Sequence, residues 1–89
     1  EDVKKCEVCV AVHVQVKLNQ NQYDALISFI FNLGCGRFER STLLHLINKW
    51  EWERASKQFP LWVKAGGRVN KGLVRRRNEE MEMFEKDTV

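Results

Sequence analysis

The sequence predicts an all-α protein, a compact cluster of five or six short helices, and three observations support this prediction. Apolar residues between positions 20 and 33 recur every three or four residues, which is the spacing of one helix face. Asn19 and Ser41, residue types common at helix N-caps, stand directly before two such stripes. The alternating valines at positions 8–16 resemble a strand, but the chain offers no second strand to pair with them. We therefore expect a single helical domain over residues 1–89.

The N-terminal segment contains two conflicting patterns. Val3, Cys6, Val10 and Val14 recur at near-helical spacing, whereas every second residue from 8 to 16 is a valine, as in a half-buried strand. Periodicity alone does not decide between the two patterns. We interpret the segment as a helix that ends near residue 12 and continues as an extended stretch over 13–18.

The most clearly predicted helix covers residues 20–33. Asn19 is a suitable N-cap, and Gly34 and Gly36 tolerate the left-handed backbone that often ends a helix. One face of this helix carries an apolar stripe, which we expect to organise the core. The stripe consists of Tyr23, Leu26, Ile27, Ile30 and Phe31.

Three further helical stretches are predicted downstream, over residues 42–49, 51–59 and 71–86. Pro60 interrupts the second stretch because it lacks an N–H, and it suits the first turn of a new short helix through Trp62. Gly66 and Gly67 form a turn before the last helix. The side chains that we expect to pack inward are Trp50, Trp52, Leu73, Val74, Met81 and Phe84.

Composition argues against several classes of function. A net charge of +3 without a long block of like charge does not favour a nucleic-acid partner. No apolar run approaches the roughly 20 residues that span a bilayer, so we expect no membrane span in this chain. A zinc site would combine the CxxC pair Cys6 and Cys9 with Cys35 and either His13 or His45. We favour a buried or disulfide role for the cysteines, with no metal and no cofactor.

The charged side chains show no catalytic arrangement. A glycosidase needs an acid of raised pKa that faces a second carboxyl group or a positioned water. We expect His13 and His45 to be surface or boundary residues, and one or two of the arginines at 75–77 to pair with Glu79, Glu80 or nearby carboxylates. We expect Asp24 to be a surface or capping carboxylate. The carboxylates that we assign to solvated surfaces are Glu1, Asp2, Glu7, Glu51, Glu53, Glu79, Glu80, Glu82 and Glu85.

Four stretches of the sequence, in this order, resemble one known family. They are LNQNQYDALISFIFNLGCG at 18–36, RSTLL at 40–44, WVKAGG at 62–67 and KGLVRRRNEE at 71–80. Together they are similar to the C-terminal lobe of phage-type lysozymes (endolysins), the muramidases of glycoside hydrolase family 24. The resemblance implies a small N-terminal lobe joined by a long helix to an all-α lobe, with the peptidoglycan groove between them. Residues 1–14 would be the second half of the interlobe helix, and residues 15–89 the C-terminal lobe.

The same resemblance implies that the catalytic residues lie outside these 89 residues. The family carries its catalytic glutamate, with an aspartate and a threonine, upstream of the matched region, and no stretch of this sequence is similar to that part. The opening residues EDVKKCEVCV read as the interior of a longer protein. We therefore expect no catalytic residue in this chain.

The resemblance and side-chain chemistry together suggest four substrate-binding residues. Phe31 and Asn32 occupy the position where the family's lobe faces the groove. For Phe31 we favour a role in the core. For Asn32 two roles remain open, contact with the substrate in the groove and a plain position on the helix surface. Trp62 offers a sugar an apolar ring face and an indole N–H, although packing is the favoured role for it. The ammonium of Lys64 would meet carboxylates of the stem peptide.

The resemblance also implies a disulfide between Cys9 and Cys35, with Cys6 outside it. Secreted members of the family often carry cysteines at these two positions. In a reducing cytoplasm both thiols would instead be reduced and buried.

Three functions remain open from the sequence. The favoured one is the substrate-facing lobe of a peptidoglycan hydrolase, inactive alone and partnered with a missing N-terminal catalytic lobe. The alternatives are a non-catalytic cell-wall or protein-binding module and a purely structural piece. Exposed lobe-interface surface would also permit a homodimer. The parent protein is expected in the host cytoplasm and then at the periplasm and cell wall during lysis.

Overall fold

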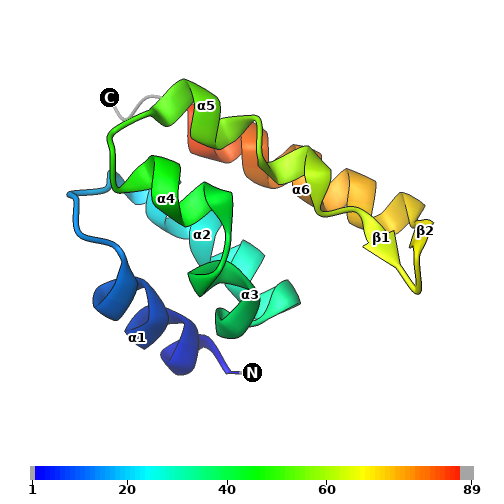
Figure 1. Cartoon of the computed structure of the whole chain (residues 1–89), viewed down its shortest axis with the longest axis horizontal. Coiled ribbons are helices and arrows are strands. Elements are labelled where there is room, and N and C mark those ends of the chain that lie inside the picture. The colour runs from blue at the N-terminus through cyan, green and yellow to red at the C-terminus, as the bar shows by residue number, and fades with distance from the viewer. Residues whose placement is uncertain (1, 87–89) are drawn as a thin grey trace.

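The computed structural model describes residues 2–86 of the chain (Figure 1). That part of the chain forms six α-helices, one 3₁₀ helix and one two-stranded hairpin. The predicted all-α cluster of short helices is confirmed, with the hairpin as an addition. The elements are α1 (Val3–His13), α2 (Gln20–Leu33), α3 (Cys35–Glu39), α4 (Thr42–Ile47), α5 (Trp52–Ser56), η1 (Phe59–Leu61), β1 (Lys64–Ala65), β2 (Arg68–Val69) and α6 (Lys71–Glu85).

Helix α2 organises the core. It packs most extensively against α6, and it also contacts α1 and α3 (Figure 1). The ring of Phe29 on α2 lies edge-on to Phe38, Phe59 and Trp62, with ring-centroid distances of 6.2, 5.6 and 5.7 Å. Such edge-to-face contacts add to the free energy gained by burying the rings. Phe29 therefore joins α2 to α3, η1 and the segment before the hairpin.

Helix α1 ends one residue later than expected, and the chain then continues without helical structure to residue 19. The side chain of Asn48 holds this stretch against the end of α4. Its Oδ1 accepts a hydrogen bond of 2.8 Å from the Gln15 N–H, and its Nδ2 donates one of 3.0 Å to the His13 carbonyl. Val14, Val16 and Leu18 pack in alternation against the core. The strand-like pattern is thus partly explained by an extended segment that pairs with no other strand.

Helix α2 has the predicted bounds, because a capping box fixes its start. The Asn19 side chain accepts from the Gln22 N–H at 2.7 Å, and the Gln22 side chain accepts from the Asn19 N–H at 2.9 Å. At its end, Gly34 has a φ of 93°, as its predicted role requires. Gly36 does not share this role, because it lies inside α3, a helix that the sequence analysis missed.

The predicted inward face of α2 is wrong by one residue. The sequence predicts a core position for Phe31, but this residue is 49% exposed. The buried stripe starts one position earlier and has the same spacing. The first residue of the buried stripe, Gln22, is polar, so a search for hydrophobic residues at helical spacing does not detect this stripe. The buried residues of α2 are Gln22, Ala25, Leu26, Phe29 and Ile30.

The two helices after α3 are shorter than predicted. Helix α4 ends at Ile47, and α5 covers only Trp52–Ser56, because a tight turn intervenes. Trp50 lies in this turn with a φ of 58° and is 67% exposed, so its predicted core role is wrong. Trp52 is half-buried and packs against the core. Pro60 lies in the first turn of η1, as predicted.

The Gly66–Gly67 turn closes a short antiparallel hairpin. Both glycines have positive φ values, 59° and 80°, which a two-residue hairpin turn of the I′ type requires. The pairing aligns Lys64 with Val69 and Ala65 with Arg68. The hairpin projects from the helical cluster at the end where α6 begins (Figure 1).

Helix α6 ends at Glu85, one residue earlier than predicted. Of the four apolar side chains expected to face inward, Phe84 is buried, whereas Leu73, Val74 and Met81 are only half-buried. The other buried residues of this helix are charged, Arg77 and Glu80.

Candidate functional site

A buried ion pair lies between α6 and α2. Arg77 is 0% exposed and Glu80 is 2% exposed. The Arg77 Nε lies 2.8 Å from Glu80 Oε1, and its Nη2 donates to Glu80 Oε2 at 3.0 Å. The predicted pairing of an arginine with Glu80 is confirmed, but the predicted solvated position of Glu80 is wrong. The solvated position was predicted because the sequence shows that Glu80 is charged but does not show that a partner compensates its charge in the core.

The surroundings of Glu80 decide what its carboxyl group can do. Burial raises its pKa, while hydrogen bonds from the Ser28 hydroxyl and Arg77 act in the opposite direction. Both hydrogen bonds reach Oε2, whereas Oε1 makes only the ion-pair contact with Arg77 Nε. No other carboxylate among residues 2–86 is buried. A shielded acid that faces a second carboxyl group is thus not found in this part of the chain.

Arg77 orients the exposed Asn32 of α2. Its Nη2 donates to Asn32 Oδ1 at 3.0 Å. Because a guanidinium group has donors only, the amide oxygen of Asn32 must face it. The two N–H groups of the Asn32 amide are consequently directed away from Arg77 and remain available at the surface.

The same arginine supports Trp62. The Arg77 guanidinium carbon lies 5.3 Å from the centre of the Phe29 ring, and this ring in turn meets Trp62. Trp62 is half-buried. Asn32 and Trp62, far apart in sequence, are thus connected through two buried side chains.

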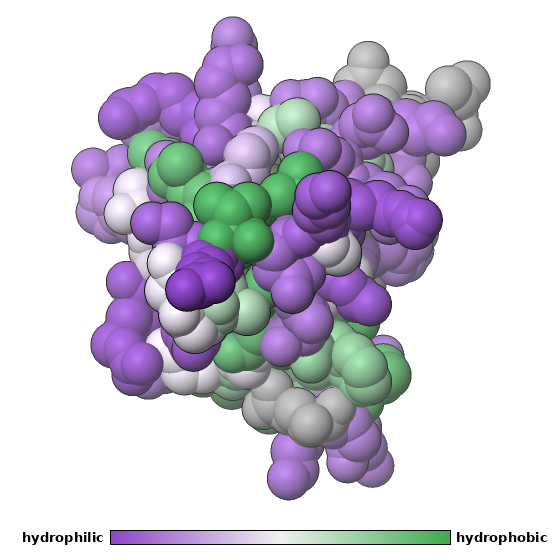
Figure 2. Space-filling model, turned by 90° about the vertical axis from the view of Figure 1, so that its right-hand side faces the viewer, coloured by the Kyte–Doolittle hydropathy of each residue, from purple (hydrophilic) through white to green (hydrophobic). Residues whose placement is uncertain are grey.

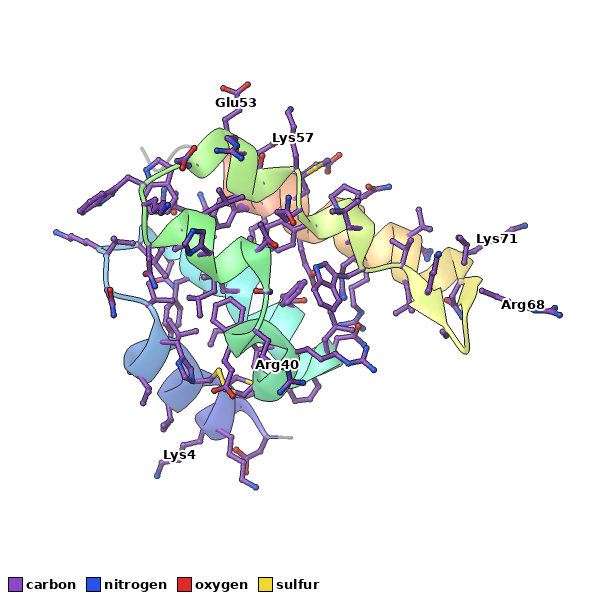
Figure 3. The ribbon with its side chains drawn as sticks, in the orientation of Figure 1. Lys4, Arg40, Glu53, Lys57, Arg68 and Lys71 are labelled. Atoms are coloured by element: carbon purple, nitrogen blue, oxygen red, sulfur yellow. A yellow bond between two sulfur atoms is a disulfide. The ribbon has the colours of Figure 1, made fainter. Side chains whose placement is uncertain are left out.

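The other two predicted binding residues, Phe31 and Lys64, have no described contact with Arg77 or Phe29. Phe31 is the neighbour of Asn32 and is exposed. Lys64 lies on the exposed strand β1. Two further basic side chains, Arg68 and Lys71, project from the same end of the molecule (Figure 3). The sequence analysis missed them, because the hairpin that places Arg68 near Lys64 was not predicted.

The surface at this end is mixed in character. Figure 2 looks onto it and shows a small apolar patch surrounded by hydrophilic side chains. Val69 of β2 is 62% exposed, and Leu73 and Val74 of α6 are half-buried. A partly apolar surface with a polar border is typical of binding regions.

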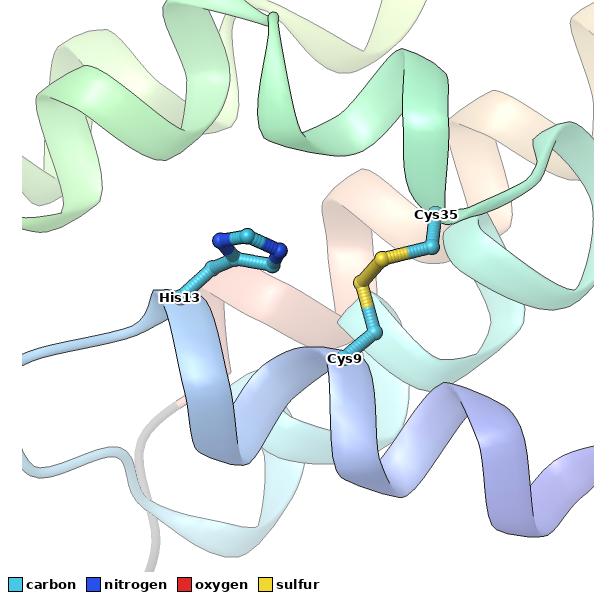
Figure 4. Close-up of side chains that lie close together, drawn as sticks. All are labelled: Cys9, His13 and Cys35. Carbon is cyan, nitrogen blue, oxygen red and sulfur yellow. A yellow bond between two sulfur atoms is a disulfide. The ribbon is translucent and has the colours of Figure 1, made fainter.

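On the other side of the molecule, a disulfide joins α1 to α3. The bonded residues are Cys9 and Cys35, whose Cα atoms are 6.0 Å apart (Figure 4). His13 lies one turn after Cys9, and its Nε2 is 3.1 Å from a carboxylate oxygen of Glu39. Cys6 is buried and is not part of this disulfide.

Comparison with known proteins places this arrangement in a family. The family model described as phage lysozyme matches residues 1–80. The chain belongs to the phage lysozyme family. It is 44% identical over 75 residues to an endolysin of Bacillus phage PZA, covering 84% of this chain and 29% of the relative. It is 46% identical over 79 residues to the endolysin of Salmonella phage P22, covering 89% of this chain and 54% of the relative.

A solved structure of a phage lysozyme has the same fold. A P22 lysozyme mutant superimposes with a TM-score of 0.90 at 40% identity, covering 96% of this chain and 57% of the mutant. The chain thus spans 29–57% of the length of these relatives and of this solved structure. No helix in the described part of the chain has the length and apolar character needed to cross a membrane.

Proposed function

We propose that this chain is the substrate-facing lobe of a peptidoglycan-hydrolysing lysozyme and that it does not cleave the glycan by itself. The proposal rests chiefly on Glu80. It is the one buried carboxylate among residues 2–86, its Oε2 accepts hydrogen bonds from Arg77 and Ser28, and its Oε1 is ion-paired with Arg77. A general acid must instead direct its proton at the glycosidic oxygen, opposite a second carboxyl group or a water. The proton donor therefore belongs to a separate N-terminal lobe.

In this proposal Asn32 and Trp62 bind the substrate. The amide N–H groups of Asn32 donate to carbonyl oxygens of the glycan or its peptide, because Arg77 holds the amide oxygen on the inner side. The exposed part of Trp62 supports a sugar ring through its apolar face. Phe31 extends this surface, and Lys64 meets the carboxylates of stem peptides.

An N-terminal lobe would join this chain through residues 1–14, as the second half of an interlobe helix, and residues 15–89 would form the C-terminal lobe. Three valines of α1 are exposed and offer apolar surface for such a partner, or for a second copy of the chain: Val3, Val8 and Val12, at 51%, 55% and 66%. The parent protein would accumulate in the host cytoplasm and act at the periplasm and cell wall during lysis.

Sedimentation with purified, insoluble peptidoglycan tests the binding role. The chain should sediment with the peptidoglycan, and Asn32→Ala should reduce the bound fraction severalfold, because a hydrogen bond to the substrate is lost. Asn78→Ala is the matched control, since Asn78 is an exposed asparagine on α6. Equal binding by both variants would contradict the assigned role of Asn32.

The alternative function, a non-catalytic cell-wall or protein-binding module, is tested by adding the N-terminal lobe of a homologous endolysin. Our proposal predicts that the joined protein releases soluble muropeptides from peptidoglycan. Binding without release in the joined protein would favour the alternative.

A further inference from the structure

The disulfide lies beside a third side chain that binds metals. The Sγ atoms of Cys9 and Cys35 and a ring nitrogen of His13 all lie within 4.8 Å of one another. Cys9 and His13 are four residues apart on α1, so both project from the same face of the helix. Figure 4 shows the imidazole of His13 directed toward the disulfide.

We propose that the reduced form of this chain binds a zinc ion through Cys9, Cys35 and His13. Two thiolates and an imidazole are a common zinc ligand set, and water or Glu39 would complete the tetrahedron. The site alternates between two states, a disulfide when oxidised and a metal centre when reduced. This inference concerns α1 and α3 and does not depend on glycan binding.

The distances allow this site with small movements. Zinc bonds of about 2.3 Å to sulfur and about 2.0 Å to nitrogen place the ligand atoms of a tetrahedral site roughly 3.5–3.8 Å apart. Cleavage of the disulfide lets the two sulfurs separate to this distance by side-chain rotation. The His13 nitrogen lies within 4.8 Å of both sulfurs, so it has to approach them by little more than about 1 Å at most.

Glu39 supports the metal-binding form of His13. Its carboxylate lies 3.1 Å from His13 Nε2. A metal on this imidazole would therefore lie close to a negative charge, which favours a cation. The site is also reachable from solvent, because a groove lined by Val8, Val12 and Cys35 opens beside it.

The chemistry balances in two steps. A thiol reductant supplies two electrons and two protons, which convert the disulfide into two thiols while the reductant itself forms a disulfide. Zinc then replaces the two thiol protons and binds both sulfurs as thiolates, so binding releases two protons and weakens as the pH falls. In the reverse direction, a small-molecule disulfide takes two electrons from the two thiolates and two protons from water and becomes two thiols, while the Cys9–Cys35 bond forms again and Zn²⁺ is released.

Competition with a chromophoric chelator tests the proposal. The full chain, reduced with a phosphine, should bind one equivalent of Zn²⁺, and the oxidised chain should bind at least tenfold more weakly. Co²⁺ in place of Zn²⁺ should give a thiolate-to-cobalt absorption band in the reduced chain only. Equal affinity in the two redox states would overturn the proposal.

Two histidine variants test the ligand assignment. His13→Gln should weaken zinc binding at least tenfold while leaving the disulfide of the oxidised chain intact. His45→Gln is the matched control, because His45 is exposed on α4, and it should bind zinc like the unmodified chain. Unchanged binding by His13→Gln would overturn the assignment, as would loss of binding in Cys6→Ala, which would make the CxxC pair the site.

Folding of the reduced chain needs its own measurement. Far-UV circular dichroism reports whether the helices persist after reduction. If they do not, added Zn²⁺ should restore them, because metal binding and folding are coupled. A reduced chain that neither binds zinc nor regains helical structure on its addition would contradict the proposal.

Discussion

The guanidinium group of Arg77 makes three contacts: it pairs with Glu80, it donates a hydrogen bond to Asn32, and it lies over the ring of Phe29. The pairing of Arg77 with Glu80 was predictable in part, because the two lie three residues apart on a helix. Their burial was not predictable. It depends on α2 bringing Ser28 and Asn32 to the same place, which is a tertiary contact that no local pattern contains.

Replacement of Arg77 by methionine should strongly destabilise the fold. The variant leaves the carboxylate of Glu80 buried without its main partner, which costs about 3–5 kcal/mol in unfolding free energy. Urea denaturation measures this loss. The double variant Arg77→Met/Glu80→Leu should recover most of the lost stability, and a single variant within about 1 kcal/mol of the unmodified chain would contradict the account.

The raised pKa of Glu80 predicts a pH dependence. The native carboxyl takes up its proton at a higher pH than the unfolded one, so the native state binds more protons in the interval above the ordinary glutamate pKa. The contribution of Glu80 to stability should therefore fall as the pH rises through this interval. Denaturation at several pH values should show this decline relative to Glu80→Gln, and a relative gain in stability would show the sign to be wrong.

At the scale of elements, the sequence predicted helix bounds correctly where residues at the helix ends determine them through contacts with their immediate neighbours. The bounds of α2 follow from Asn19 and Gly34, which act on their immediate neighbours. The inward face of α2 was wrong because Gln22 is a buried polar residue that also belongs to the capping box. The hairpin was missed because each strand has two residues, too few for a detectable alternation.

The corrected face of α2 predicts opposite outcomes for two phenylalanines. Phe29→Ala should lower the unfolding free energy by about 3–5 kcal/mol, because it removes a ring from the centre of the core. Phe31→Ser should change it by less than about 1 kcal/mol, since this side chain is half exposed. Denaturant titrations of both variants distinguish the two faces. A larger loss of unfolding free energy for Phe31→Ser than for Phe29→Ala would show that the face containing Phe31 is the buried one.

At the scale of the whole molecule, the disulfide adds a covalent link to α1, which also packs against α2 and α3. Cys9 and Cys35 are separated by 26 residues, so their bond links α1 to the helices around α2. The family resemblance, and no local pattern, suggested this pairing. Phe31 and Asn32 were likewise suggested by the resemblance, whereas Trp62 and Lys64 were suggested by their side-chain chemistry, and the binding role of all four remains a proposal.

Reduction of the disulfide should lower stability by about 3–4 kcal/mol in the absence of zinc, the value expected from chain entropy for a loop of this length. Thermal unfolding with and without a phosphine reductant measures the difference. The Cys6→Ala variant, which keeps the bond, should still show it. An unchanged melting temperature after reduction would mean that the bond does not constrain the unfolded chain.

The most direct test of the central claim is glycan hydrolysis by the 89-residue chain alone. Purified peptidoglycan is incubated with the chain, and the reducing ends that muramidase cleavage creates are quantified. We predict no release above the level of buffer, because the buried carboxyl of Glu80 is engaged by Arg77 and Ser28. Release by the isolated chain, abolished in Glu80→Gln, would contradict the account.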